Sequence, residues 1–169
     1  ELHKVDVPGD VKIVNATSGN GALSAIGADG KVYKTGNYPT TPLADSGATW
    51  DLSNPYFVTY NALYYAQWDA ESTQVKTGFN FDPAYDAYID LSSSVRPGAN
   101  IRRVKTNTAS SKLIAVDTLG GVCIFDRVAG DNSSIINNPD VNFVDVAVHY
   151  QASTPGFGLD GDGKLHDLI

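Results

Sequence analysis

The chain has 169 residues, of which 42% are hydrophobic and 18% are charged, a composition that fits one compact domain burying about 70% of its unfolded surface. Its net charge of −7 and isoelectric point near 4.7 argue against partners that need a basic surface, namely nucleic acid and anionic membranes. Its single cysteine, Cys123, cannot form an internal disulfide, and no apolar run approaches the roughly 20 residues of a membrane helix.

Short segments rich in β-branched and aromatic residues recur along the whole chain. Gly, Pro, Asn, Asp or Ser separate them at intervals of roughly 8 to 12 residues, as in sandwiches, barrels and propellers. The clearest segments are residues 11–14, 57–60, 101–104, 113–116 and 143–148. No stretch sustains the apolar stripe of a packed helix. The sequence therefore predicts an all-β fold.

A unit of strand, tight turn and strand occurs four times, in residues 21–36, 63–78, 113–124 and 157–166. In the first copy the turn is Asp29-Gly30, and glycine recurs there because such turns need a positive φ. The first two copies both end in Lys-Thr-Gly. A repeat of about 40 residues is typical of propeller blades.

A further strand precedes each hairpin, and a fourth follows it, marked by residues 50–52 in the first unit and 89–91 in the second. The last unit has only three strands, whereas residues 5–7 at the start of the chain look like a fourth. We therefore predict a four-bladed β-propeller closed by the N-terminal strand, because closure hides free sheet edges. A fragment of a larger propeller and a β-sandwich remain alternatives. The predicted blades are residues 10–52, 56–91, 100–137, and 143–169 together with 4–8.

In residues 21–36 apolar residues flank Asp-Gly-Lys, and Tyr33 and Gly36 follow; residues 157–166 repeat the apolar residues and Asp-Gly-Lys, with Leu165 and His166 after them. This string resembles the blade signature of RCC1-type repeats. It is also similar to the hairpins of tectonin or tachylectin-like lectins. The resemblance implies a recognition scaffold and carries no catalytic residue to this chain.

Loops on a rigid scaffold are the usual place for binding. Two connections in each four-stranded blade emerge on one face, which we expect to carry the long loops at residues 37–48, 80–86, 128–134 and 149–151. Aromatic rings beside carboxylates suit sugars, which have apolar faces and hydroxyl groups. The predicted ligand-binding residues are Tyr38, Trp50, Asp82, Tyr85, Asp86 and Tyr150. Trp68, by contrast, aligns with Ile26, Val116 and Leu159 and is predicted to lie between blades.

Two metal hypotheses are weaker. The acidic stretch around Asp160 and Asp162 is similar to a calcium loop, but the full spacing fails and a turn is the better interpretation. His3 and His166 would lie on neighbouring strands of a closed ring, which leaves open a haem or zinc site resembling hemopexin domains. We expect no cofactor.

A basic group, Arg96, Arg102, Arg103, Lys105 and Lys112, could bind an acidic ligand or form a solvated strand face. The sequons at Asn15 and Asn132 leave glycosylation open. No nucleophile elbow or metal-ligand cluster is present in the sequence.

The sequence therefore predicts a non-enzymatic recognition module, extracellular or surface-exposed, that binds carbohydrate. The alternative is a structural or attachment domain of a larger surface or virion assembly that binds protein partners; an oligomer is left open. Because the sequence lacks methionine, we expect Glu1 to be a processed or trimmed end.

Overall fold

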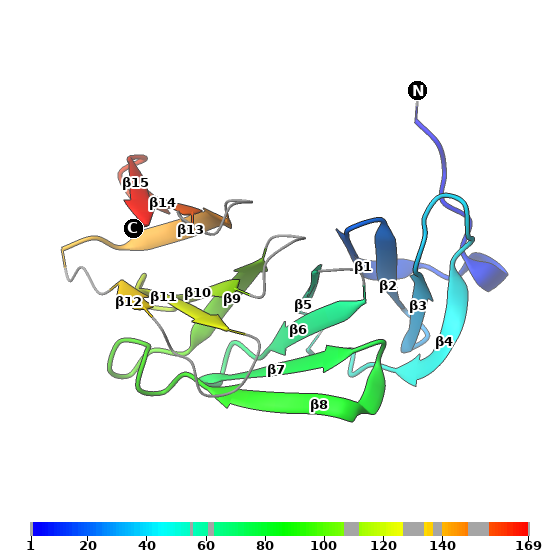
Figure 1. Cartoon of the computed structure of the whole chain (residues 1–169), viewed down its shortest axis with the longest axis horizontal. Coiled ribbons are helices and arrows are strands. Elements are labelled where there is room, and N and C mark those ends of the chain that lie inside the picture. Colours follow the sequence, from blue (N-terminus) through cyan, green and yellow to red (C-terminus); the bar gives the residue numbers. More distant parts are fainter. Residues whose placement is uncertain are drawn as a thin grey trace.

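The computed structural model describes residues 2–54, 56–60, 63–106, 112–126, 134–136, 140–148 and 156–168. In these residues the chain forms four separate antiparallel sheets, each a simple up-and-down meander (Figure 1). The all-β prediction is confirmed, and each sheet is one blade of a β-propeller. The one helical element in this part of the chain is a short 3-10 turn, η1 (Pro8–Asp10).

The strands follow one another from the inside of each blade to its outside. The first blade contains β1 (Ile13–Gly19), β2 (Ala22–Gly27), β3 (Lys31–Thr35) and β4 (Ala44–Thr49). The second contains β5 (Phe57–Tyr60), β6 (Tyr64–Trp68), β7 (Gln74–Phe79) and β8 (Asp82–Asp90). The third contains β9 (Ile101–Thr106), β10 (Lys112–Asp117), β11 (Val122–Asp126) and β12 (Ser134–Ile136). The fourth contains β13 (Phe143–Val148), β14 (Gly156–Asp160) and β15 (Leu165–Leu168).

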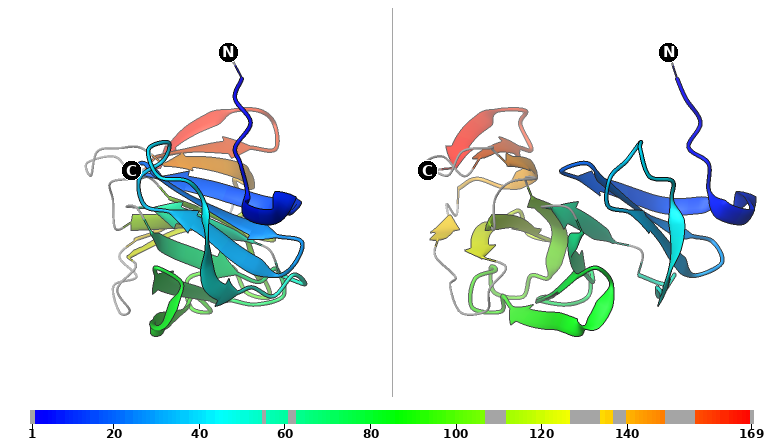
Figure 2. Two further views of the ribbon diagram at one scale, coloured as in Figure 1. Left: turned by 90° about the vertical axis from the view of Figure 1, so that its right-hand side faces the viewer. Right: turned by 45° about the vertical axis from the view of Figure 1, so that its right-hand side comes forward.

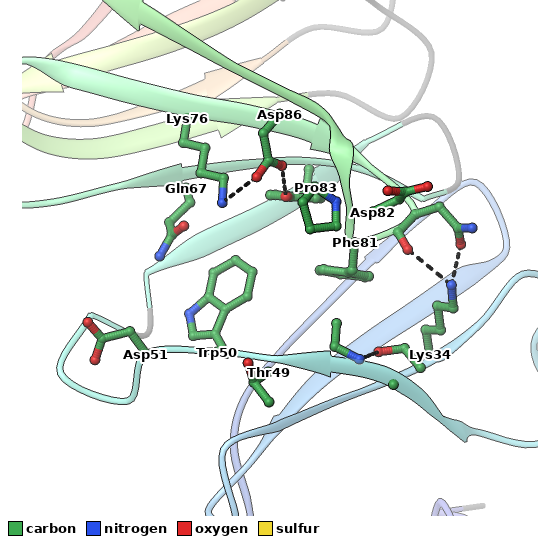
Figure 3. Close-up of a pocket in the computed structure, with 15 residues that line it drawn as sticks. Lys34, Thr49, Trp50, Asp51, Gln67, Lys76, Phe81, Asp82, Pro83 and Asp86 are labelled. Carbon is green, nitrogen blue, oxygen red and sulfur yellow. Dashed lines mark hydrogen bonds and ion pairs between the residues drawn. The ribbon is translucent and has the colours of Figure 1, made fainter.

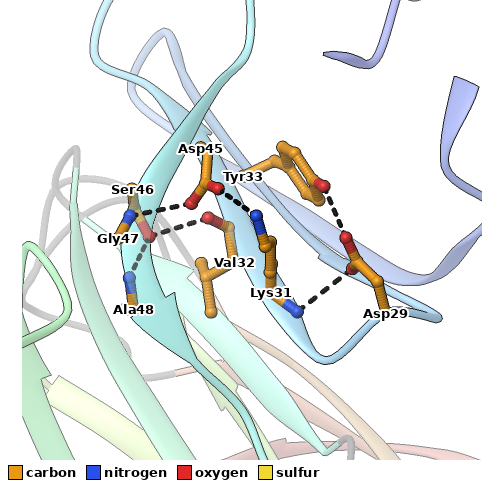
Figure 4. A network of polar contacts seen from close by, with 8 residues as sticks. All are labelled: Asp29, Lys31, Val32, Tyr33, Asp45, Ser46, Gly47 and Ala48. Carbon is orange, nitrogen blue, oxygen red and sulfur yellow. Dashed lines mark hydrogen bonds and ion pairs between the residues drawn. The ribbon is translucent and has the colours of Figure 1, made fainter. Parts of the chain in front are cut away.

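The turn between the second and third strands is fastened by an aspartate. Asp29 accepts hydrogen bonds from the Lys31 backbone N–H at 3.1 Å and from the Tyr33 hydroxyl at 2.7 Å (Figure 4). Gly30 follows with φ +77°, a conformation that a side chain disfavours. Asp160 has the same role in the fourth blade, where it accepts from the Lys164 N–H at 2.8 Å. The acidic stretch at 160–162 is therefore a turn, and the described residues contain no cluster of metal-ligating side chains.

Each pair of neighbouring blades encloses its own apolar core. Between the first and second blades, Ile26 and Val32 meet Phe57, Tyr65 and Phe81. The second core includes Trp68, which is 6% exposed as predicted, and donates its indole N–H to the carbonyl of Arg102 at 3.2 Å. The third core joins β10 and β11 to β13 and β15. Burial between blades thus stabilises the assembly pair by pair.

The four blades form an open arc. Neighbouring blades touch through their inner strands, β1 with β5, β5 with β9 and β9 with β13. The first blade lies at one end of the arc and the fourth at the other, on opposite sides of the molecule (Figures 1 and 2).

The predicted closing strand is not confirmed. Residues 5–7 have no strand structure, and the fourth sheet has the order β13-β14-β15 in the described part of the chain. The N-terminal segment runs beside the first blade, far from β15 (Figure 2). Residues 5–7 therefore do not pair with β15 in this structure.

Two predicted loops are in fact strands. Residues 44–48 belong to β4, whose small and polar side chains show no apolar alternation. The strand is held in the sheet by pairing with β3 and by the 2.7 Å ion pair between Lys31 and Asp45 (Figure 4). Residues 82–86 belong to β8, because β7 and β8 are joined by a turn of only two residues. The predicted fourth strand at 50–52 lies instead in the connector after β4.

Candidate functional site

A cavity of about 620 Å³ lies between the first and second blades (Figure 3). Its walls come from β3 and β4 on one side and from β6, β7 and β8 on the other. The lining residues are Lys34, Ser46, Gly47, Ala48, Thr49, Trp50, Asp51, Tyr65, Gln67, Lys76, Asn80, Phe81, Asp82, Pro83 and Asp86. The cavity therefore occupies the groove between two blades and is built mainly by strands, not by the loop face that we predicted.

The cavity is open because the outer part of this groove is not filled. Between the second and third blades, Leu91, Val95 and Ala99 of the connector are buried and extend the apolar core. Between the first and second blades the corresponding connector provides Trp50 and Asp51 at the cavity wall instead. The difference between two connectors thus decides where the propeller has a hollow.

Three aromatic rings form the apolar wall. Trp50 packs on Phe57 at 5.1 Å, on Tyr65 at 5.8 Å and on Phe81 at 6.1 Å between ring centroids. Tyr65 and Phe81 are stacked at 4.8 Å and 6°. The Trp50 indole N–H already donates to the carbonyl of Asn54 at 3.0 Å. Trp50 therefore presents ring surface to the cavity, not a free N–H group.

Phe81 is held in the wall by a strained turn. It and Asn80 are the two residues of the β7–β8 hairpin, and both have φ of 58°. Asparagine tolerates this left-handed conformation, whereas other side chains pay about 1–2 kcal/mol. Phe81 nevertheless occupies it and is 7% exposed. Strain of this kind often marks a functional position.

A polar network borders the rings on the second blade. The Tyr65 hydroxyl donates to Asp86 at 2.7 Å, and the other oxygen of Asp86 forms a 2.8 Å ion pair with Lys76. Burial, followed by the hydrogen bond to Asp86, raises the pKa of Tyr65 well above its ordinary value. Asp86 is therefore ordered by two partners at the edge of the cavity.

Lys34 links the two walls. Its ammonium group donates to the Asn80 carbonyl oxygen at 3.1 Å and to the Asn80 side chain. Burial lowers the pKa of Lys34, and the nearby Asp82 carboxylate opposes that effect. The cavity thus combines amines, carboxylates, amides and aromatic rings within one groove.

A second hollow of about 280 Å³ continues from the first. Both are lined by Gln67 and Lys76, and the second is also lined by Trp68 and Tyr88. The Asn54 side-chain oxygen, which belongs to this second lining, is buried and has no hydrogen-bond partner among the described residues. Together the two hollows form an elongated groove along the second blade.

The structure brings together three of the six predicted ligand residues, Trp50, Asp82 and Asp86, in the cavity. Tyr38 does not line it, and neither does Tyr85, which is 60% exposed and packs edge-on against Phe79. Tyr150, like Asn132, lies outside the described residues.

In the described part of the chain the structure does not bring together His3 and His166, the two histidines of the haem or zinc hypothesis. His166 lies in the fourth blade, where its Nε2 is 2.7 Å from Asp160. His3 belongs to the N-terminal segment beside the first blade (Figure 1).

The basic group predicted from the sequence joins two blades: Arg102 donates to the carbonyl of Val144 at 2.8 Å, and Arg103 pairs with Asp145 at 3.1 Å.

Sequence reasoning missed Lys34, Lys76, Gln67 and Phe81. The repeat contained a signal for two of them, because Lys34 and Lys76 are the lysines of the two Lys-Thr-Gly copies. Strand pairing places Lys34 opposite Ser24 and Lys76 opposite Gln67, so the two lysines lie on opposite faces of their blades and reach the groove from its two sides. Phe81 gave no signal, because phenylalanine is unexpected in a two-residue hairpin turn.

No protein-family profile matches the sequence, and no curated protein matches it. Solved structures do match. Yeast RCC1 (Prp20), in a crystal structure with Kap60, has a TM-score of 0.64 and 11% identity over 98% of this chain and 45% of its own. The computationally designed Ika4 protein has a TM-score of 0.60 and 13% identity over 100% of this chain and 98% of its own. YCF48, in a structure bound to D1 peptide, has a TM-score of 0.56 and 9% identity over 93% of this chain and 51% of its own.

These similarities show the fold: the chain is a β-propeller repeat protein. The chain spans about half the length of RCC1 and of YCF48. Whether its blades are of the RCC1 or the tectonin type is not confirmed. In the described part of the chain, no helix has the length and apolar character needed to cross a bilayer.

Proposed function

We propose that this protein is a recognition module that binds a carbohydrate in the cavity between its first and second blades. The observation that carries the proposal is the composition of one cavity: stacked rings of Tyr65 and Phe81 beside Trp50, bordered by the charged groups of Asp82 and Lys34. A sugar ring has apolar C–H faces that pack on aromatic rings and hydroxyl groups that bond to carboxylates and amines.

The size and rigidity of the cavity support the same proposal. Its volume of about 620 Å³ falls in the range of small-ligand sites, roughly 300–1,000 Å³. Its lining residues come from paired strands, and Asp86 is fixed by Tyr65 and Lys76. Groups that are ordered before binding lose little entropy when the ligand arrives.

The proposal assigns binding rather than catalysis to these groups. Asp86 is engaged by Lys76 and Tyr65, and Lys34 is engaged by the Asn80 turn. It requires no cofactor, and a role outside the cell or at its surface would bring such a site to free glycans.

A glycan array, probed with and without calcium, followed by calorimetric titration of any hit, tests the proposal. Asp82→Asn removes one cavity charge and keeps the oxygen that accepts the Ala84 N–H at 2.9 Å. Its matched control is Asp90→Asn, an exposed aspartate outside the cavity that accepts the Ser92 N–H at 2.9 Å. We expect about tenfold weaker binding for Asp82→Asn and unchanged binding for Asp90→Asn. Absence of binding to every glycan, or equal effects of both changes, would contradict the proposal.

A second candidate ligand is an extended protein segment. The observation in its favour is the elongated groove made by the two hollows that share Gln67 and Lys76. The similar propeller YCF48 was solved bound to D1 peptide, and yeast RCC1 with Kap60. Selection from a peptide library, with Gln67→Ala and Asp82→Asn as variants, separates the two: a peptide that loses affinity in Gln67→Ala, together with silence on glycans, would favour a protein ligand.

A further inference from the structure

The fourth blade presents an apolar face that nothing covers in the described structure. Phe157 and Leu159 on β14 and Leu165 on β15 are 42%, 37% and 74% exposed. They line a shallow hollow of about 310 Å³ on the side of the sheet that faces away from the third blade. The face is independent of the cavity proposed above to bind a ligand.

The first three blades bury the same three positions. In each blade, two residues on the second strand and one on the third face the next blade, and the register of strand pairing defines the equivalence. In blades one to three these residues are at most 6% exposed: Ser24, Ile26 and Val32; Ala66, Trp68 and Val75; Ile114, Val116 and Val122. Phe157, Leu159 and Leu165 are their counterparts. The fourth blade therefore offers the surface that each earlier blade uses to bind its successor.

The other end of the arc offers the complementary surface. Blades two to four receive their predecessor through a large apolar residue on the inner strand, Phe57, Val104 or Val146, each at most 4% exposed. These residues pair with Gln67, Ala115 and Gly158. The equivalent residue of the first blade is Ala16, which pairs with Ala25 and is exposed, and the nearby Val14 is 46% exposed.

On the outer part of that face, the side chains already have partners within the chain. Tyr33 is 3% exposed and hydrogen-bonded to Asp29, and Lys31 is paired with Asp45 (Figure 4). Of the described elements on this face, the inner strand β1 is the one that leaves apolar side chains exposed to solvent. The same division holds between the second and third blades, where the connector residues Leu91, Val95 and Ala99 cover the outer part and the inner strand receives the neighbouring blade.

We propose that the outer face of the fourth blade docks on β1 of a second copy of this chain. Because the first and fourth blades lie on opposite sides of the arc (Figure 1), two copies related by a two-fold axis close into one ring of blades, with each junction placing the last blade against an inner strand as neighbouring blades are placed within the chain. A head-to-tail contact gives a closed ring when the rotation between its two surfaces divides a full turn. The junction removes Phe157, Leu159 and Leu165 from water.

Sedimentation velocity of the 169-residue chain across micromolar concentrations tests the proposal. The expected result is a species with twice the 18.0 kDa mass of one chain. Leu165→Glu is expected to give monomer only; its side chain is already mostly exposed in the single chain, so the fold survives. The matched control is Leu119→Glu, which is 51% exposed in the β10–β11 turn and is expected to leave the dimer intact.

A mixing experiment identifies the two surfaces. Ala16→Arg on β1 is also expected to give monomer only. When the two variants are mixed, one junction of the ring joins two unchanged surfaces and the other brings the introduced carboxylate and the introduced guanidinium into the same interface, so the dimer returns. A wild-type chain that stays monomeric would overturn the proposal. So would Leu165→Glu remaining dimeric, or Ala16→Arg remaining dimeric while Leu165→Glu is monomeric, which would indicate contact between two fourth blades.

Discussion

Tyr65 on β6 and Asp86 on β8 are joined by a 2.7 Å hydrogen bond that crosses the strand β7 lying between them. The ring passes over β7 at Gly78, which pairs with Tyr65. A Cβ atom at Gly78 would lie 2.5 Å from the Tyr65 ring. The wall of the cavity therefore depends on the absence of a side chain at one position of a neighbouring strand.

We expect Gly78→Ala to lower the free energy of unfolding by about 1–3 kcal/mol, the usual cost of overpacking. The matched control is Gly36→Ala, at the last residue of the other Lys-Thr-Gly copy, where a Cβ would meet nothing within 4 Å. Urea denaturation of both variants measures the difference. Equal losses would contradict the role assigned to Gly78.

Tyr65→Phe tests the hydrogen bond itself. Tyr65 is 3% exposed, so the ring stays packed while Asp86 loses a buried donor. Hydrogen bonds to charged groups contribute about 1.5–3 kcal/mol, and Asp86 keeps Lys76, so we expect a loss near the lower figure. Tyr88→Phe, at a tyrosine that is 63% exposed, should be neutral in the same urea titration; a Tyr65→Phe variant as stable as wild type would refute the prediction.

Phe81→Asn sets backbone strain against aromatic packing. Asparagine accommodates φ of 58° and recovers about 1–2 kcal/mol, but loss of a buried aromatic ring costs about 3–5 kcal/mol. Packing should win, with a net loss of about 2 kcal/mol in thermal or urea unfolding. Asn80→Gly, which keeps the ring and the turn, should cost less than Phe81→Asn. A stabilised Phe81→Asn variant would mean that the ring contributes little to the wall.

Cys123 should be unreactive in the native protein. It is 3% exposed, and burial raises the pKa of its thiol to about 12. Its folded pKa exceeds its ordinary value of 9.0, so its contribution to stability is complete below about pH 9 and is lost as pH rises toward about 12. A disulfide reagent at neutral pH should label the thiol only after addition of denaturant. Rapid labelling without denaturant would contradict this burial.

The β14–β15 turn should weaken in acid. The hydrogen bond with His166, followed by the backbone N–H of Lys164, lowers the pKa of Asp160 below 3.8. A carboxylate whose pKa is depressed in the folded state stabilises it above the ordinary value and loses that effect as pH falls through the folded pKa. Urea midpoints of wild type should therefore fall more steeply below about pH 4 than those of Asp160→Asn. Parallel curves for the two proteins would contradict the prediction.

The repeat could be found in the sequence because strand and turn requirements are local. The Asp-Gly turns, the alternation of apolar residues and the burial of Trp68 all follow from a pattern that each blade carries in its own residues. The strand β4 escaped notice, because Ala44–Thr49 is small and polar. Its place is set by hydrogen bonding to β3, which no side-chain pattern of its own reveals.

The candidate site was predictable only in part. Trp50, Asp82 and Asp86 were predicted as ligand residues from their residue types, and they line the cavity. Tyr85 was predicted for the same reason, because it is an aromatic residue beside carboxylates in the sequence, but it lies outside the cavity lining. The cavity exists because one connector leaves the groove between two blades unfilled, and that depends on how blades pack, not on any single loop.

The sequence by itself determined the all-β class, the repeated blade and the direction in which each blade buries its apolar residues, because these depend on neighbours a few residues apart. Only the tertiary structure decided that the blades open into an arc rather than a ring closed by residues 5–7. The angle between successive blades comes from side chains of two sheets packed face to face, so it is a property of contacts between residues far apart in the chain, such as Thr17 and Thr59. Because that angle keeps the arc open, no blade covers Leu159 in the described structure. Its counterparts Ile26, Trp68 and Val116 each face a following blade and are buried.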